Sequence, residues 1–236
     1  MLVSMIYLER SKVYKYLLID CDDTVLDFGK SERVSISKVM EKYGVRPTSQ
    51  AVEKYVKLNE KFWRMFEKGK ISKEELLKKR FVKFFKKYHI DVDGDIINKE
   101  YLDTLTYNVF VIDGVEKILT YLKDKGYKLY FITNGVKKTQ EARWNRTDVL
   151  KYFDGAFISE DIGYHKPQKE YFEYVVKSIG DNDLNNYLVI GDNIQSDIIG
   201  GLNYGMDVAW FNPKRERSKI KVNYEFNNLD DYYKYL

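Results

Sequence analysis

Two aspartates separated by a single residue, Asp20 and Asp22, are the clearest candidates for chemistry in this chain. They close an apolar run in residues 16–24, with the sequence YLLIDCDDT, that has the character of a buried strand. Since side chains alternate along an extended segment, we expect both carboxylates on one side and Cys21 on the other, facing the core. Neighbouring carboxylates repel unless a cation, a proton or a hydrogen-bond donor stabilises them. A Mg²⁺ site and a nucleophile paired with a general acid–base both fit the pattern, and a polar turn after a strand would explain it as well.

Further polar residues follow later apolar segments that also resemble strands. Thr133 and Asn134 come after one such segment, Asp192 comes after another, and Lys166 lies before a proline in a loop between them. In an open parallel sheet the carboxyl ends of the strands share one edge, where ligands bind. The pattern therefore predicts that these residues converge with the two aspartates on one site.

The first element that must position this site is a helical insert after the first strand. Residues 30–107 have apolar side chains at helical spacing almost throughout. At one break Thr48 or Ser49 can cap the next helix, and at a second break Ser72 and Glu75 have the spacing of a capping box. The sequence therefore predicts several consecutive helices rather than a mixed segment.

The second element is an alternation of strands and helices from residue 113 onwards. Repeated strand–helix units predict a parallel sheet with helices on both faces. The helical insert would then lie over the carboxyl edge of that sheet as a cap. After the first strand, the expected strands are residues 127–132, 157–158, 187–190 and 208–211.

The composition fits one large domain or a core with a modest insert. The chain has 236 residues, of which 44% are hydrophobic, a formal net charge of +4 and a single cysteine. One cysteine excludes an internal disulfide and a cysteine-based zinc cluster. Short basic clusters at 78–80, 86–87 and 214–217 are expected on solvated faces, so no nucleic-acid polymer is predicted as a partner.

The sequence carries no pattern typical of export or membrane insertion. Residues 1–14 lack the basic start, apolar stretch and small-residue cleavage site of a signal peptide. No apolar segment is long enough to span a bilayer. We therefore expect a soluble cytoplasmic protein with no membrane partner.

Four motifs, in this order, resemble those of the haloacid dehalogenase superfamily of phosphohydrolases. They are residues 20–24 (DCDDT), 132–135 (ITNG), 165–167 (HKP) and 191–197 (GDNIQSD). Each motif is weak alone, but the ordered set after apolar strands is specific and covers nearly the whole chain. The stretch from the last motif to residues 210–213 (WFNP) also resembles the pyrimidine 5′-nucleotidase branch, which dephosphorylates nucleoside monophosphates.

The resemblance implies a fold and a domain division. The fold class is α/β, with a doubly wound, Rossmann-like parallel sheet as the core. Residues 1–28 and 108–236 would form that catalytic core. Residues 29–107 would form an inserted α-helical cap of the superfamily's first (C1) class.

The resemblance also implies catalytic roles for the carboxylates. Asp20 would be the nucleophile that forms an aspartyl-phosphate, which splits one displacement into two easier ones. Asp22 would be the general acid–base, with its backbone carbonyl on the metal. Asp192 would be a second metal carboxylate, so that Asp20, Asp22 and Asp192 hold Mg²⁺, which prefers oxygen ligands. Dehalogenases of the superfamily generally lack the acid at the position of Asp22, so its presence favours phosphate transfer.

Other motif residues are expected to bind phosphate or to support the site. Thr133, Asn134 and Lys166 would contact the phosphate, with Lys166 as a point cation. Support is expected from Thr24 through a hydroxyl bond to the first loop, from the close backbone approach at Gly135, and from two residues of the last motif. Those two are Asn193 and Asp197, the latter expected at the start of a helix, where it would hold Lys166 or a water or ligate the metal directly.

The leading hypothesis is a Mg²⁺-dependent phosphomonoesterase acting on pyrimidine nucleoside 5′-monophosphates, with a small phosphate ester as its partner molecule. The aromatic side chains of Phe28, Trp63 and Phe66 could stack a base under the cap, although aromatic residues at helical spacing also form cores. A sugar-phosphate phosphatase or phosphomutase is the main alternative. A non-catalytic binding protein and a 2-haloacid dehalogenase are further alternatives, and both a monomer and a homodimer remain open.

Overall fold

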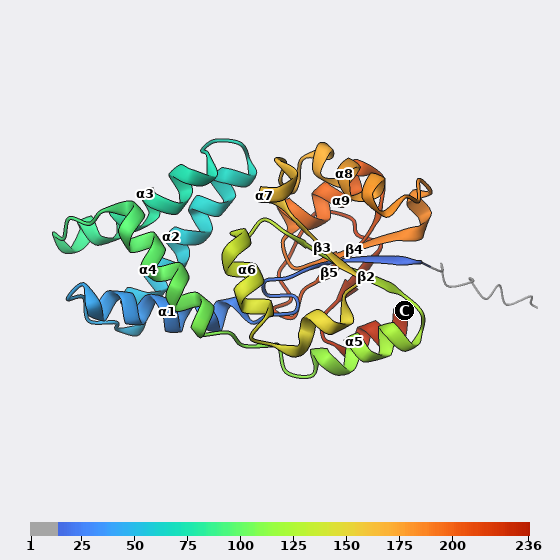
Figure 1. Ribbon diagram of the computed structural model, residues 1–236, viewed down its shortest axis with the longest axis horizontal. Helices are drawn as coiled ribbons and strands as arrows, with labels where there is room; N and C mark the ends of the chain where they lie inside the picture. Colours follow the sequence, from blue (N-terminus) through green and yellow to red (C-terminus); the bar gives the residue numbers. More distant parts are fainter. Residues whose placement is uncertain (1–13) are drawn as a thin grey trace, which may run out of the picture.

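A parallel sheet forms the centre of the molecule. The computed structural model describes residues 14–236. The expectation that residues 1–14 carry no export signal therefore lies almost wholly outside the described residues. The sheet has six strands in the order β3-β2-β1-β4-β5-β6, and every neighbouring pair is parallel. The predicted α/β fold with a doubly wound sheet is confirmed (Figure 1). The strands are β1 (Tyr16–Asp20), β2 (Lys128–Thr133), β3 (Gly155–Ile158), β4 (Tyr187–Gly191), β5 (Asp207–Phe211) and β6 (Tyr224–Phe226).

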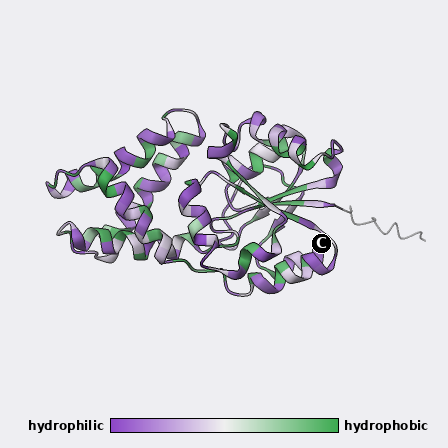
Figure 2. Ribbon diagram, viewed as in Figure 1, coloured by the Kyte–Doolittle hydropathy of each residue, from purple (hydrophilic) through white to green (hydrophobic). Residues whose placement is uncertain are grey.

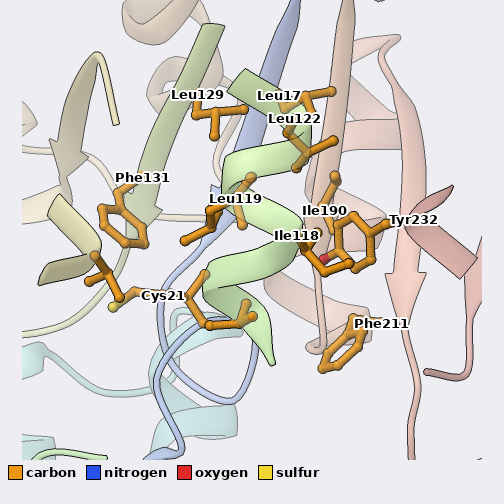
Figure 3. Packing of buried hydrophobic residues seen from close by; sticks show 14 of the residues in the cluster. Leu17, Cys21, Ile118, Leu119, Leu122, Leu129, Phe131, Ile190, Phe211 and Tyr232 are labelled. Atoms are coloured by element: carbon orange, nitrogen blue, oxygen red, sulfur yellow. The ribbon is translucent and has the colours of Figure 1, made fainter. Parts of the chain in front are cut away.

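Strand β1 is apolar along its whole length because both of its faces are covered. Leu17 and Ile19 belong to one buried cluster, whereas Leu18 belongs to the cluster on the other face. Figure 3 shows the first cluster, to which Leu119 and Leu122 of helix α5 (Val115–Asp124) belong together with Leu17. The continuous apolar run therefore ends only where the strand reaches the edge of the sheet, at Asp20.

Helices and short helical turns connect the strands. The pairing of β1 with β2 and of β1 with β4 brings three strand ends to the same edge. The connecting helices are α5 (Val115–Asp124), α6 (Lys137–Trp144), α7 (Ser159–Ile162), α8 (Lys169–Ile179) and α9 (Ile199–Tyr204), and α10 (Asp230–Tyr235) follows β6. The shorter turns are η2 (Asp148–Tyr152), η3 (Leu184–Asn186) and the π-helical turn η4 (Ile194–Ile198).

Four helices between β1 and α5 form a separate group beside the sheet (Figure 1). They pack on one another around a cluster of their own, centred on residues such as Tyr55, Phe81 and Phe84. Figure 2 shows that these helices alternate hydrophilic and hydrophobic residues, as expected for helices that bury one face. The helices are α1 (Phe28–Lys42), α2 (Ser49–Glu67), α3 (Lys73–Phe85) and α4 (Gly94–Tyr107), with the turn η1 (Lys86–Tyr88) after α3.

The predicted helix starts in this group are confirmed in detail. Thr48 accepts a hydrogen bond from the backbone of Ala51 at the start of α2. Ser72 and Glu75 form both bonds of a capping box at the start of α3. Local side-chain chemistry therefore fixes where two of the four helices begin.

The sequence-based interpretation missed several short elements. Strand β6 has three residues, and α6, α7 and α10 are each eight residues or fewer, too short to show a clear period. Within residues 14–236, no helix combines the length and the apolar character needed to cross a membrane.

Candidate active site

A cavity lies between the carboxyl edge of the sheet and the helices α1–α4. Its volume is about 190 Å³, many times the roughly 10–15 Å³ that one water molecule requires, so it can hold a small organic molecule. On the sheet side it is lined by Asp20, Asp22, Thr133, Asn134, Gly135, Lys166, Asp192, Asn193 and Asp197. The convergence expected from the four motifs is therefore present in space.

Lys166 is the centre of the charged end of this cavity. Its Nζ donates to Asp20 Oδ1 and to Asp197 Oδ1, both at 2.6 Å, and to the carbonyl of Ile132 at 3.0 Å. The Lys166 side chain is only 2% exposed. Burial lowers the pKa of Lys166, but the carboxylates of Asp197 and Asp20 outweigh it and raise that pKa, so the ammonium stays charged.

Three carboxylates share the space beside Lys166. Oxygen atoms of Asp20, Asp192 and Asp197 lie within 4.8 Å of one another. Burial, followed by repulsion from neighbouring carboxylates, raises the pKa of Asp192 well above its usual value. Burial does the same for Asp20, against the opposing effect of Lys166. A hard divalent cation would reverse these shifts, and an all-oxygen donor set is the one that Mg²⁺ prefers, so the residues fit the predicted ion.

Asp22 points to a different part of the cavity from Asp20. Its carboxylate accepts from Arg143 Nη1 at 2.6 Å and from Gln140 Nε2 at 2.9 Å. Both partners belong to α6 and are buried. The Asp22 side chain lies outside the three-carboxylate group, and the assignment of its backbone carbonyl to the metal stays a prediction. Sequence reasoning missed Arg143 and Gln140, whose only signal is their i, i+3 spacing on one short helix.

Cys21 and Thr24 complete the first loop. Cys21 is buried, and Trp144 Nε1 donates to its sulfur at 3.2 Å, which agrees with the expected core-facing side chain. Thr24 is also buried, but its hydroxyl has no hydrogen-bond partner among the described residues. The expectation that this hydroxyl bonds to the loop backbone is therefore wrong. Backbone bonds hold the loop instead, such as Leu26 N to Cys21 O at 2.9 Å.

The loop after β2 is held by its own side chains. Asn134 Nδ2 donates to the carbonyl of Lys166 at 2.8 Å, and Lys166 N donates to Asn134 Oδ1 at 2.9 Å. Thr133 Oγ1 accepts from Gly135 N at 3.0 Å and from Gln140 Nε2 at 2.9 Å. The Asn134 amide therefore fixes the loop that carries Lys166.

Glycine at position 135 is explained by a neighbouring side chain. A Cβ atom there would lie 2.6 Å from Gln140 Nε2, which is closer than such contacts normally come. The space that Gly135 leaves is thus taken by Gln140, the residue that also bonds to Asp22. The group that approaches closely at Gly135 is a side chain, and the expected approach of the backbone to a phosphate stays a prediction.

Asn193 and Asp197 organise the loop after β4. Asn193 Oδ1 accepts from the backbone N–H groups of residues 195 and 196, and Asn193 Nδ2 donates to Glu67 Oε1 at 3.0 Å. Asp197 Oδ2 accepts from Asn193 N at 3.2 Å. Asp197 lies inside η4, whose cap is Asn193, so it does not begin a helix as expected. Its contact with Lys166 agrees with the expected supporting role.

The opposite wall of the cavity comes from α1–α4. Two of the three expected aromatic side chains, Phe28 and Trp63, line it. Phe66 is buried and packs on His165 in the loop before α8, with ring centres 4.1 Å apart, and it is not among the residues that line the cavity. Sequence reasoning missed the remaining residues of this wall, which are Glu67, Leu77, Arg80, Tyr101, Leu102 and Leu105.

Comparison with known proteins assigns this arrangement to a wider group. A model of the family described as haloacid dehalogenase-like hydrolase matches residues 17–211. The HAD-hydrolase YfnB of Bacillus subtilis is 35% identical over 95% of this chain and 96% of its own length. Pyrimidine 5′-nucleotidase PynA of Streptococcus pneumoniae is 32% identical over 92% of this chain and 93% of its own. Pyrimidine 5′-nucleotidase YjjG of Escherichia coli is 27% identical over 84% of this chain and 86% of its own.

A solved structure of one of these relatives matches over nearly the full chain. A crystal structure of YfnB superimposes with a TM-score of 0.89 at 34% identity, covering 94% of this chain and 98% of YfnB. It contains magnesium and is described as showing interdomain movement. Its overall arrangement of sheet and helices is thus the one seen here.

Proposed function

The chain belongs to the haloacid dehalogenase-like hydrolases, and we propose that it is a magnesium-dependent phosphomonoesterase for pyrimidine nucleoside 5′-monophosphates. The observation that carries the reaction type is the shared cavity of Asp20, Asp22 and Lys166. The substrate class is supported by PynA and YjjG, relatives that are pyrimidine 5′-nucleotidases. It is also supported by the two ends of the cavity, one charged and one largely apolar.

Asp20 is proposed as the nucleophile. Its carboxylate attacks the phosphorus, an aspartyl-phosphate bond forms and the bond from phosphorus to the nucleoside 5′-oxygen breaks. Lys166, 2.6 Å from Asp20, offsets the negative charge of the carboxylate and the incoming phosphate. The N–H groups of the loop after β2 supply further donors to the phosphate oxygens.

Asp22 is proposed as the general acid–base. It gives a proton to the leaving 5′-oxygen, and it then takes a proton from the water that attacks the phosphorus of the aspartyl-phosphate. That second attack releases inorganic phosphate and restores the Asp20 carboxylate. Gln140 and Arg143 orient the Asp22 side chain from α6.

Asp20, Asp192 and the backbone carbonyl of Asp22 are proposed to hold Mg²⁺, which when bound would neutralise charge and align the phosphate for in-line attack. Asp197 belongs to the same carboxylate group but already binds Lys166, so we assign it the positioning of that lysine. Of the three carboxylates, Asp20 and Asp192 are thus assigned to Mg²⁺, and Asp197 is assigned to the ammonium of Lys166.

We also propose that residues 29–107 act as a cap over the site. The group α1–α4 has its own buried cluster and reaches the core through side chains such as Lys73, which donates to Gly135 O at 2.9 Å. Closing such a cap would exclude water and position a small ester, which disfavours large phosphoprotein substrates. The proposed substrate therefore fits a closed cavity rather than an open groove.

A substrate panel tests the proposal. Phosphate release is measured with Mg²⁺ for UMP, dUMP, dTMP, AMP, ribose 5-phosphate and other sugar phosphates. Selective release from the pyrimidine nucleotides is expected. Release mainly from sugar phosphates would keep the mechanism and replace the substrate class, whereas no release from any ester would contradict the phosphomonoesterase.

A further inference from the structure

A buried arginine occupies the part of the cavity wall that is built by the cap helices. Arg80 of α3 is 2% exposed and lines the cavity. Its Nη1 donates to Asn59 Oδ1 at 2.6 Å and its Nη2 donates to Asn98 Oδ1 at 3.0 Å. Both acceptors are neutral amides, so no carboxylate bonds directly to this guanidinium among these contacts.

A polar chain behind Arg80 fixes its position. Asn59 Nδ2 donates to Glu32 Oε1 at 2.7 Å, which orients the Asn59 amide with its oxygen toward Arg80. The Arg80 guanidinium also lies over the rings of Phe81 and Tyr101, at 4.6 and 5.0 Å from their centres. Arg80 belongs to α3, and each of the other three cap helices contributes a residue that helps to hold its side chain in place.

Two donors of this wall have no partner within the described part of the chain. Arg80 Nε is buried and makes no hydrogen bond, and the buried Tyr101 hydroxyl makes none either. Both residues line the cavity. An unsatisfied buried donor is costly, and a ligand that offers acceptors would remove that cost.

The surroundings of these donors are apolar. Leu77, Leu102 and Leu105 line the same wall, together with the aromatic side chains of Phe28 and Trp63. A guanidinium only donates hydrogen bonds, so the ligand group that it binds must be an acceptor. A flat ring with apolar faces and a carbonyl oxygen at its edge meets both requirements.

We propose that Arg80 and Tyr101 select the substrate by donating hydrogen bonds to a carbonyl oxygen of its pyrimidine base, an inference that rests on the proposed nucleotidase function. The charged end of the cavity has its own cation, Lys166, for the phosphate. The cap end provides donors against apolar walls, which suits the part of the substrate far from the phosphate. Arg80 and Tyr101 are thus assigned to specificity and not to the chemical step.

Steady-state kinetics on a matched pair of esters test this assignment. The esters are dUMP and ribose 5-phosphate, which has a similar phosphate end and no base. For Tyr101→Phe, the ratio of kcat/KM for dUMP to that for ribose 5-phosphate is expected to fall roughly 3- to 10-fold. For Arg80→Lys the expected fall is roughly 10- to 100-fold, because a charged donor is lost from the fixed geometry. Most of each change should appear in KM.

Tyr55→Phe is the matched control. The Tyr55 hydroxyl is also buried, and its ring lies 5.9 Å from that of Tyr101, but Tyr55 does not line the cavity. This variant should keep the wild-type ratio. Thermal unfolding of all three variants checks the fold, and Tyr101→Phe decides the matter if Arg80→Lys does not fold.

Two results separate the possible failures. An equal loss on dUMP and ribose 5-phosphate in Tyr101→Phe and Arg80→Lys would overturn base recognition, since it would mean that these side chains serve the phosphate end or the cap fold. A wild-type enzyme that hydrolyses ribose 5-phosphate but no pyrimidine nucleotide would instead overturn the nucleotidase function on which the inference rests. Retained ratios in both variants, with wild-type activity on dUMP, would overturn the inference alone.

Discussion

The two ends of the cavity each contain a buried cation, and the cations are held in opposite ways. Lys166 at the sheet edge has two carboxylate oxygens at 2.6 Å. Arg80 in the cap has two amide oxygens, at 2.6 and 3.0 Å, and its nearest acidic connection runs through Asn59 to Glu32. One end is a compensated cluster of charges, whereas the other is a fixed donor in a neutral setting.

This difference separates two tasks that the proposed function requires. A cluster in which cation and anions balance can accept a phosphate and a divalent ion with rearrangement of charge among close neighbours. A donor held by neutral amides keeps its direction regardless of the ionisation of the site. The charged end, which is proposed to react, is built from loops after parallel strands. The cap end, which is proposed to select the substrate, is built from the faces of packed helices.

Removing divalent ions would affect the charged end most strongly. With EDTA, phosphate release is expected to fall roughly 10³-fold or more, because the ion supplies several kcal/mol of charge stabilisation. Added Mg²⁺ should restore it. Activity that is indifferent to chelation would remove the distinction between a metal-dependent end and a neutral end.

Replacing the compensating lysine should cost folding stability. Lys166→Met leaves Asp20 and Asp197 facing each other without their cation, and we expect a loss of about 3–5 kcal/mol in urea unfolding at neutral pH in EDTA. Lys99→Met is the control, since Lys99 pairs with Asp103 on the surface and should leave the stability nearly unchanged. Similar small losses in both variants would contradict a compensated cluster.

The cap end should make the stability of the protein depend on pH through Glu32. Burial raises the pKa of Glu32 to about 8, against the opposing effects of Asn59 and Arg80. Because the folded-state pKa is raised, the stabilisation by the bound proton is fully present below about pH 4.5 and is lost as the pH rises through about 8. The unfolding free energy of wild type relative to Glu32→Gln is therefore expected to fall by a few kcal/mol between pH 5 and roughly 8.

The matched control for Glu32 is Glu173→Gln, an exposed change in α8. Its stability should keep a constant difference from that of wild type over the same pH range. If Glu32→Gln also keeps a constant difference, Glu32 is charged in the folded protein, and the cap end then resembles the charged end more than the contacts indicate.

The smallest expected effect concerns the contact between the two ends. Lys73 donates to Gly135 O and pairs with Glu160 at 2.7 Å, which joins α3 to the core. Partly exposed pairs contribute about 0.2–1 kcal/mol, so Lys73→Met should raise KM by roughly 2- to 5-fold with little change in kcat. The neighbouring Lys78→Met, whose partners Glu74 and Asp95 are both on cap helices, should leave KM unchanged. Equal KM values in the two variants would show that Lys73 does not bias cap closure.

The charged end could be predicted from the sequence, and the cap end could not. Asp20 and Thr133 directly end apolar strands, and Asp192 and Lys166 lie in short motifs in the loops at the same edge, so topology brings all four together. Arg80 and Tyr101 are separated by a helix junction and show only helical spacing, which is the same for core residues. Which face of a helix meets a cavity depends on how several helices pack, and that is not encoded locally.

The sequence also failed to predict several hydrogen-bond partners within the site. Thr24 was expected to bond to its loop through its hydroxyl, yet backbone bonds and other side chains hold that loop. Gln140 and Arg143 were missed because one turn of the short helix α6 places both on Asp22, and no motif marks that pairing. Motif order predicted where the site lies, while its hydrogen bonds required the packed structure.

The proposed chemistry is tested most directly by Asp20→Asn. This variant removes the nucleophile and changes little volume, so it should fold, bind dUMP and release no phosphate in the presence of Mg²⁺. The measurement is steady-state phosphate release by wild type and Asp20→Asn, with thermal unfolding as the check on folding. Activity in the wild type and a loss on the order of 10⁴-fold or more in the variant is the expected result. Sustained turnover by a folded Asp20→Asn enzyme would contradict covalent catalysis through Asp20.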